Sequence, residues 1–394
     1  MILRSRIFLA NSRIIITDAG IVTEGGFISD IGKYETVKIR NVGAQTLDFD
    51  GIICPALINA HTHLELSPFK SIAHKDFVDW VLHLVAERFS RQYEDLSTEC
   101  AKAKYEAEKS GTSYFINVGN DFELNRQLGG NQNFQFEQIG INEKNAGGVF
   151  DRALSLVSGR SNFPISLAIH APYSTSASLM KKVKTFNNER GTITSIHLAE
   201  TEDEVEFVRS RTGRMADLLN SRVGEGKWSF RATGKSPVEY VDSLGILDEK
   251  TLCVHCVFVD NRDLEILRRR KCGVVICARS NRNLTGRIPN VSKFLQNGIK
   301  ILLGTDSRAS STDLDMFAEM SAFYREFHGS LDPSRVFQMA TTGAAEFLGI
   351  SDPYGQISVG KTSAAVYVPF KGRTADAFEF LVTDAKGKAE AISN

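Results

Sequence analysis

The alternation of short apolar segments with longer helical patterns constrains the fold of this chain most. From Gly51 onward, short apolar runs recur between stretches with apolar residues at helical spacing, such as 76–91. Strands that alternate with helices pair in parallel, and eight such units close into a (β/α)8 barrel. The eight predicted strands are 51–58, 113–118, 136–141, 166–170, 194–197, 251–255, 273–278 and 300–305.

The length of 394 residues leaves room for more than a barrel. Residues before the first predicted strand contain short β-prone runs, among them 36–39, separated by Gly and Asp turns, and the tail returns to β patterning at 364–368. We therefore predict an α/β fold, a TIM-like barrel with a small β-sandwich domain formed by both chain ends. The predicted boundaries are 51–351 for the barrel and 1–50 plus 352–394 for the small domain.

Three further segments have local signatures. Residues 202–220 have a helical pattern, and the polar, Gly/Asn-rich residues 120–133 predict a loop at the carboxyl ends of the strands. Residues 355–362 match the Walker A pattern, which needs a preceding strand and a following helix. Because a β-prone run follows instead, we interpret this segment as a turn into the small β domain.

Composition narrows the classes of function. Lys plus Arg equals Asp plus Glu at 47 each, so bulk charge does not favour a nucleic-acid partner. No apolar run approaches the ~18 residues of a membrane span. Six cysteines in a chain of this length favour a reducing cytoplasm over a disulfide scaffold. We expect a cytoplasmic protein with a small-molecule substrate. The sequence does not determine the oligomeric state, and a homodimer is one of the possible states.

Two histidines follow the first predicted strand. His61 and His63 are two residues apart, so their side chains point to the same side of an extended chain. Imidazoles that converge from a rigid element suit a divalent metal such as zinc. Two structural histidines at a strand end would leave the same pattern, and the pair alone does not decide.

Polar residues end several other predicted strands. Barrel active sites form at the carboxyl ends of the strands, so the residues found there are expected to lie together. The joint placement favours a functional site over a set of unrelated structural residues. Besides His61 and His63, the residues at these ends are His170, His197, His255 and Asp306.

As a set, these residues resemble the amidohydrolase superfamily, in the branch that deaminates purines, pterins and related rings. The short sequence motifs that carry the resemblance are distributed over nearly the whole chain. Those around His61 and His170 look most like the aminofutalosine deaminases of menaquinone biosynthesis, and relatives in the branch act on S-adenosylhomocysteine or methylthioadenosine. The motifs are 59–63, 169–173, 197–201, 254–256, 280–281 and 303–307.

The resemblance implies one divalent metal, zinc first and Fe²⁺ or Mn²⁺ as alternatives. His61, His63, His197 and Asp306 would bind it, and His170 stands where a binuclear relative would need a lysine. The catalytic roles that it implies are the base that deprotonates water, a group that orients the hydroxide, and the acid that protonates the ring. These roles fall to Asp306, His255 and Glu200 respectively.

The sequence leaves more than one interpretation open for the roles of some residues and for the function of the protein. The resemblance places His170 and Glu200 against the substrate; Trp80 could line the substrate site or belong to the core, and Glu65 could support a metal ligand or form a salt bridge. The most favoured function is deamination of an adenosine-like nucleoside. Alternatives are an enzyme for guanine, pterin or chlorotriazine substrates, and a catalytically silent ligand-binding barrel.

Overall fold

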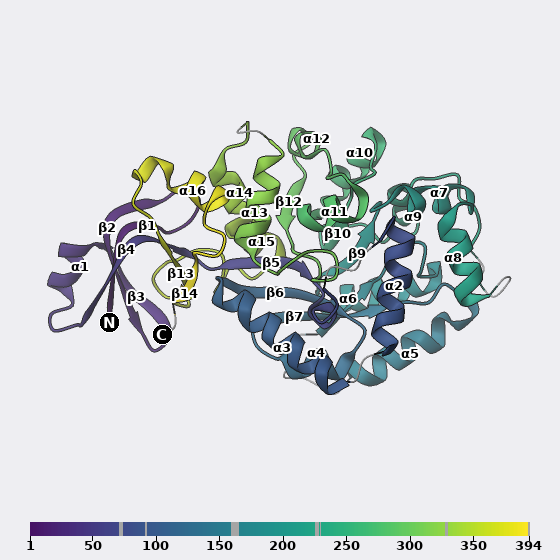
Figure 1. The fold of residues 1–394 in the computed structure, drawn as a ribbon, viewed down its shortest axis with the longest axis horizontal. Coiled ribbons are helices and arrows are strands. Elements are labelled where there is room, and N and C mark those ends of the chain that lie inside the picture. The colour runs from purple at the N-terminus through teal and green to yellow at the C-terminus, as the bar shows by residue number, and fades with distance from the viewer. Residues whose placement is uncertain are drawn as a thin grey trace. The chain divides into compact units, whose positions relative to one another are not determined.

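The computed structural model describes residues 1–70, 74–90, 93–158, 165–224, 228, 230–327 and 330–392 (Figure 1). The chain divides into two compact units. One comprises 1–60, 104–115 and 314–394, and the other 61–103 and 116–313. The predicted domain boundaries at 50/51 and 351/352 stay a prediction.

Eight parallel strands form the predicted barrel. Thr62 at the end of the first barrel strand bridges in parallel to Asp306, which follows the last one, and so closes the ring. The TIM-like architecture is therefore confirmed. In spatial order the barrel strands are β5 (Leu57–Thr62), β6 (Thr112–Gly119), β7 (Gln132–Gln138), β8 (Ile165–Ile169), β9 (Thr194–Leu198), β10 (Thr251–His255), β11 (Gly273–Ile276) and β12 (Lys300–Leu303).

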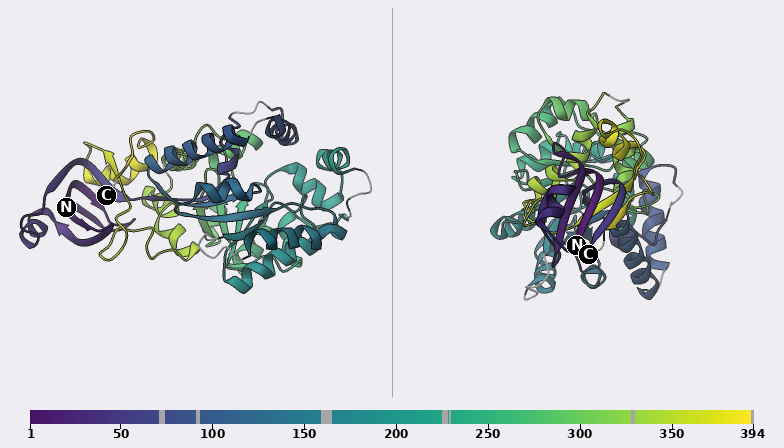
Figure 2. Two further views of the ribbon diagram at one scale, coloured as in Figure 1. Left: turned by 90° about the horizontal axis from the view of Figure 1, so that it is seen from below. Right: turned by 90° about the vertical axis from the view of Figure 1, so that its left-hand side faces the viewer.

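Helices lie on the outer side of the barrel strands (Figures 1 and 2). In the part of the chain that the structure describes, no helix combines the length and the apolar character that crossing a membrane requires. The α-helices among the described residues are α1 (Tyr34–Arg40), α2 (Phe77–Ser90), α3 (Tyr93–Lys109), α4 (Phe122–Leu128), α5 (Ala146–Val157), α6 (Ala177–Arg190), α7 (Glu202–Ser210), α8 (Arg214–Val223), α9 (Pro237–Ser243), α10 (Asn261–Arg270), α11 (Ala278–Thr285), α12 (Val291–Gln296), α13 (Met316–Arg325), α14 (Pro333–Met339), α15 (Thr342–Leu348) and α16 (Ala377–Thr383).

Both chain ends contribute to a second sheet, as predicted (Figure 2). Its described strands form one six-stranded sheet instead of the two stacked sheets of a sandwich, because β4 pairs with β1 on one side and with β13 on the other. The spatial order is β14 (Glu390–Ile392), β13 (Ala365–Pro369), β4 (Thr46–Pro55), β1 (Ile2–Leu9), β2 (Ile15–Glu24) and β3 (Phe27–Lys33).

Two predictions near the amino terminus were wrong. Residues 36–39 belong to helix α1 instead of a strand, because Tyr34 and Val37, three residues apart, pack together against the sheet. The apolar run 51–58 is divided between β4 and β5, which belong to different sheets. The interpretation of 355–362 as a turn is supported, because strand β13 is the next element.

Two predictions within the barrel unit also need correction. The segment 120–133 contains helix α4, which Asp121 caps by accepting a hydrogen bond from the Leu124 backbone N–H at 3.0 Å. The predicted helix 202–220 is two helices, α7 and α8. It breaks at Arg211, whose φ of 62° is left-handed, and α8 starts after Gly213 with φ 83°.

Gly304, directly after β12, lies against the backbone of His61. A Cβ atom at Gly304 would lie 2.8 Å from the His61 carbonyl oxygen and 2.9 Å from its backbone nitrogen. We predict that Gly304→Ala lowers the free energy of unfolding by about 1–3 kcal/mol, because strand β5 must move away. Urea denaturation measures this change.

Gly148→Ala is the matched control for this prediction. Gly148 lies in helix α5, and a Cβ atom added to it would meet no other atom within 4 Å. The substitution should be neutral or stabilising by up to about 1 kcal/mol. Equal unfolding free energies for the two variants would contradict the role of Gly304 in barrel closure.

Candidate metal centre and active site

The end of strand β5 brings the first two histidines to the last strand of the barrel. The Asp306 backbone N–H donates to the His61 carbonyl at 3.1 Å, and the His63 N–H donates to the Asp306 carbonyl at 3.3 Å. These two bonds hold both histidines beside Asp306. All three residues are buried.

Four potential ligand atoms converge at this point. His197 Nε2 lies 3.2 Å from both His61 Nε2 and His63 Nε2. Asp306 Oδ1 lies 3.8 Å from His61 Nε2 and 3.7 Å from His63 Nε2. A tetrahedral zinc with ligands at about 2.0–2.2 Å keeps its ligand atoms about 3.4 Å apart. The donor set therefore fits one small divalent metal.

The protonation of this cluster also suits a metal. Burial, reinforced by the neighbouring histidines, lowers the pKa of His61 well below its usual value. The same causes lower the pKa of His197. Neutral imidazole is the form that binds metals, so these rings need not lose a proton first.

Asp306 is held in its ionised form by its surroundings. Burial opposes ionisation, but His63, His255 and two hydroxyl groups outweigh it, so the pKa of Asp306 lies below its usual value. Ser280 Oγ and Ser310 Oγ donate to Asp306 Oδ2 at 2.6 and 2.7 Å. These bonds leave Oδ1 directed at the histidines. No sequence pattern indicated that these two serines contact Asp306.

Glu200 and His255 face each other beside the cluster. Glu200 Oε1 lies 3.4 Å from His255 Nε2. Burial first, and then the charges of Asp306 and Glu204, raise the pKa of Glu200 well above its usual value. Asn281 Nδ2 donates to His255 Nδ1 at 2.8 Å, so the neutral His255 ring carries its proton on Nε2. A carboxyl group with a raised pKa and a fixed imidazole tautomer thus lie together.

The backbone is strained where several of these strands end. Ala199, His255, Cys256 and Asp306 have positive φ angles of 51°, 75°, 48° and 58°. Residues other than glycine rarely adopt this region, and such strain clusters at functional sites. The turns occur at or just after the ends of β9, β10 and β12, where they redirect the chain around the cluster.

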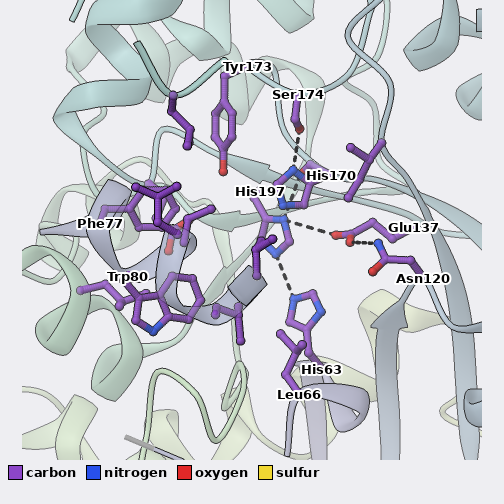
Figure 3. Close-up of a pocket in the computed structure, with 18 of the residues that line it drawn as sticks. His63, Leu66, Phe77, Trp80, Asn120, Glu137, His170, Tyr173, Ser174 and His197 are labelled. Carbon is purple, nitrogen blue, oxygen red and sulfur yellow. Dashed lines mark hydrogen bonds and ion pairs between the residues drawn. The ribbon is translucent and has the colours of Figure 1, made fainter. Parts of the chain in front are cut away.

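A pocket of about 360 Å³ opens onto the cluster. Figure 3 shows His63, His170 and His197 on one side of it, with Phe77 and Trp80 opposite. Trp80 lines the pocket and also belongs to a buried apolar cluster, and its Nε1–H donates to the Ala309 carbonyl at 3.1 Å.

His170 lies in the pocket, where its Nδ1 is 2.5 Å from Ser174 Oγ. Burial lowers the pKa of His170 to about 3, so the ring is neutral. Its backbone carbonyl is 2.9 Å from His197 Nδ1, which donates to it. This bond fixes the proton of His197 on Nδ1 and leaves Nε2 free for a metal.

A polar network extends from Glu65 to the pocket. Arg88 Nη1 lies 2.9 Å from Glu65 Oε1 and donates to Asn120 Oδ1 at 3.1 Å. Asn120 Nδ2 then donates to Glu137 Oε2 at 2.7 Å, and Glu137 Oε1 lies 3.8 Å from His197 Nδ1 (Figure 3). The salt-bridge interpretation of Glu65 is therefore supported. Asn120 and Glu137 were not identified from the sequence.

The family model described as "Amidohydrolase family" matches residues 52–386. The chain belongs to the amidohydrolase family. This match covers most of the chain and includes the residues of the histidine–aspartate cluster. The family is metal-dependent, in agreement with the donor set described above.

Relatives with known names align with almost the whole chain. The 5-methylthioadenosine/S-adenosylhomocysteine deaminase of Syntrophobacter fumaroxidans is 29% identical, covering 93% of this chain and 85% of its own. The 5'-deoxyadenosine deaminase of Methanopyrus kandleri is 30% identical, covering 88% and 80%. The crystal structure of Helicobacter pylori aminofutalosine deaminase with methylthio-coformycin has a TM-score of 0.83 at 23% identity, covering 99% and 97%. The similarity to the Helicobacter pylori structure is a similarity of fold.

Proposed function

We propose that this amidohydrolase catalyses the metal-dependent hydrolytic deamination of an adenosine-like nucleoside. The convergence of His61, His63, His197 and Asp306 beside the buried Glu200 carries the proposal. In the overall reaction, water replaces the exocyclic amine of the ring and ammonia is released. A metal-dependent family and relatives named as deaminases support this reaction class.

The cluster would hold one divalent metal through three histidine nitrogens and Asp306 Oδ1. We propose zinc, and Fe²⁺ or Mn²⁺ accept the same donors. When bound, such a metal lowers the pKa of a water molecule toward ~7 and so supplies the nucleophile at neutral pH.

The surrounding side chains accept, hold and donate the protons of the reaction. Asp306, ionised and directed by two serine hydroxyls, takes the proton of the attacking water. His255, with its proton on Nε2, orients the nucleophile. Glu200, protonated because it is buried beside other carboxylates, donates to a ring nitrogen and then assists departure of the amine as ammonia.

The pocket suits a purine ring that carries an apolar extension. Apolar side chains of α2 and α8 line it, including Phe77, Val81 and Leu219. Among adenosine-like nucleosides we propose aminofutalosine first, because of the motifs around His61 and His170, which would place the reaction in menaquinone biosynthesis. S-adenosylhomocysteine and methylthioadenosine come next, supported by the names of the relatives.

We also propose that the enzyme acts in the cytoplasm. All six cysteines are buried and none is paired in a disulfide in the described structure, as expected of a protein made in a reducing compartment. Buried thiols in apolar strands behave as small hydrophobic groups, so they need no metal or disulfide partner.

An assay of ammonia release tests the proposed reaction. The panel comprises adenosine, 5'-deoxyadenosine, methylthioadenosine, S-adenosylhomocysteine and aminofutalosine, with guanine as the comparison. We expect release from adenosine-type nucleosides by metal-loaded protein and none from guanine, because the proposed site is matched to the adenine amine. Release from none of the nucleosides would contradict the proposal.

Glu200→Gln tests the assignment of the acid. The substitution removes the transferable proton but keeps size, so we predict a loss in kcat of about 10²- to 10⁴-fold. Metal content, measured by atomic emission, should be unchanged because Glu200 lies outside the donor set. Glu202→Gln is the control, since this neighbouring glutamate is exposed. Loss of metal from Glu200→Gln would instead make Glu200 a ligand.

A further inference from the structure

Glu204 is a buried glutamate to which the proposed mechanism assigns no proton transfer, although its charge contributes to the raised pKa of Glu200. It lies in the first turn of α7 and is fully buried. Within the described part of the chain, no lysine, arginine or histidine forms an ion pair with it. Burial raises the pKa of Glu204 to about 7, and hydrogen bonds from the backbone of Glu200 and Ala199 counter part of that shift.

Both oxygens of Glu204 accept hydrogen bonds from consecutive backbone groups. The Ala199 N–H donates to Oε1 at 2.9 Å, and the Glu200 N–H donates to Oε2 at 2.9 Å. In an ordinary capping box, the glutamate at this helix position bonds the N–H of the N-cap residue. The N-cap here is Thr201, so Glu204 reaches beyond it into the turn after β9.

The turn that Glu204 binds is strained. Ala199 has a left-handed φ of 51°, which costs free energy for a residue with a Cβ atom. Its carbonyl accepts a hydrogen bond from the Phe258 N–H at 2.9 Å, on the segment that follows His255. Backbone groups on both sides of Ala199 are thus held, and the conformation is imposed by its neighbours.

Two acceptor oxygens are needed to satisfy both N–H groups at once, and the Glu204 carboxyl group supplies them. A glutamine offers one acceptor oxygen and turns its NH₂ group against the second N–H donor. The helix amino terminus around Thr201 also favours a negative charge at this position. These requirements explain why position 204 is a glutamate. A role in packing alone would be met equally well by glutamine, which has nearly the same volume.

We propose that Glu204 is a positioning residue, which clamps the strained Ala199–Glu200 turn and so directs the Glu200 carboxyl group toward His255 and the substrate. This inference rests on the proposed function, because it assigns Glu200 its role as the acid. The clamp fixes the backbone of Glu200. The side chain that extends from this backbone places its Oε1 atom 3.4 Å from His255 Nε2. Glu204 itself is not among the residues that line the pocket.

Glu204→Gln in the metal-loaded, full-length enzyme tests the clamp by a split between kcat and KM. We expect kcat to fall by about 10- to 100-fold, because small displacements of a catalytic group are costly, while KM changes by less than about threefold. Metal content should stay at the wild-type value. Glu202→Gln removes the same charge from the same helix turn and should keep wild-type kcat. Wild-type kcat per folded chain in Glu204→Gln would overturn the proposal.

Glu204→Asp provides the same test if Glu204→Gln does not fold. It keeps the charge but is one methylene shorter, so it cannot reach both N–H groups. Ala199→Gly adds a rescue measurement, because glycine adopts the left-handed turn without strain. In the Glu204→Gln background it should raise kcat by up to about fivefold. No gain would overturn the claim that the clamp holds this turn.

Crystal structures of wild type and Glu204→Gln test the clamp without any substrate. We expect Ala199 to leave the left-handed region or Glu200 to move away from His255, and unchanged geometry would overturn the clamp. If wild-type enzyme releases no ammonia from any adenosine-type nucleoside, the proposed function fails. The structural comparison then still decides whether Glu204 holds the turn.

Discussion

The convergence of three imidazole nitrogens and one carboxylate oxygen is the constraint on which the rest of the site depends. Because His197 carries its proton on Nδ1, its Nε2 lone pair faces the Nε2 atoms of His61 and His63, and burial removes the water that would otherwise solvate these rings. The His197 Nε2 distances of 3.2 Å therefore fit a metal centre much better than a set of structural histidines. The backbone carbonyl of His170 and the hydroxyls of Ser280 and Ser310 orient the donors from outside.

Holding these donors requires backbone conformations that ordinary strands do not supply. Gly304 allows β12 to approach His61 closely, and Asp306 turns through a left-handed conformation to present its carboxylate. Ala199 turns in the same way after β9 and places Glu200 beside His255. Hydrogen bonds from neighbouring segments hold Ala199 and Asp306, so the surrounding barrel offsets the cost of the strained geometry.

The barrel and the convergence of its strand-end histidines were predictable because both follow from local patterns. Strand β10 has the predicted bounds, and the histidines that end strands share one edge of the sheet by topology. The break between α7 and α8 was missed because an arginine, Arg211, takes the left-handed position instead of glycine. Contacts of Ser280 and Glu137 were missed because they join residues far apart in sequence, which no periodicity records. The roles of the individual residues stay predictions.

Titration of metal-free protein with zinc tests the proposed metal centre most directly. We predict that deaminase activity rises linearly with added zinc and saturates at one metal per chain, since four donors converge on one point. The His63→Ala protein, with one donor removed, should bind zinc more weakly and remain inactive at that stoichiometry. Activity that is independent of zinc, or that saturates at two metals per chain, would contradict a single metal site at this cluster.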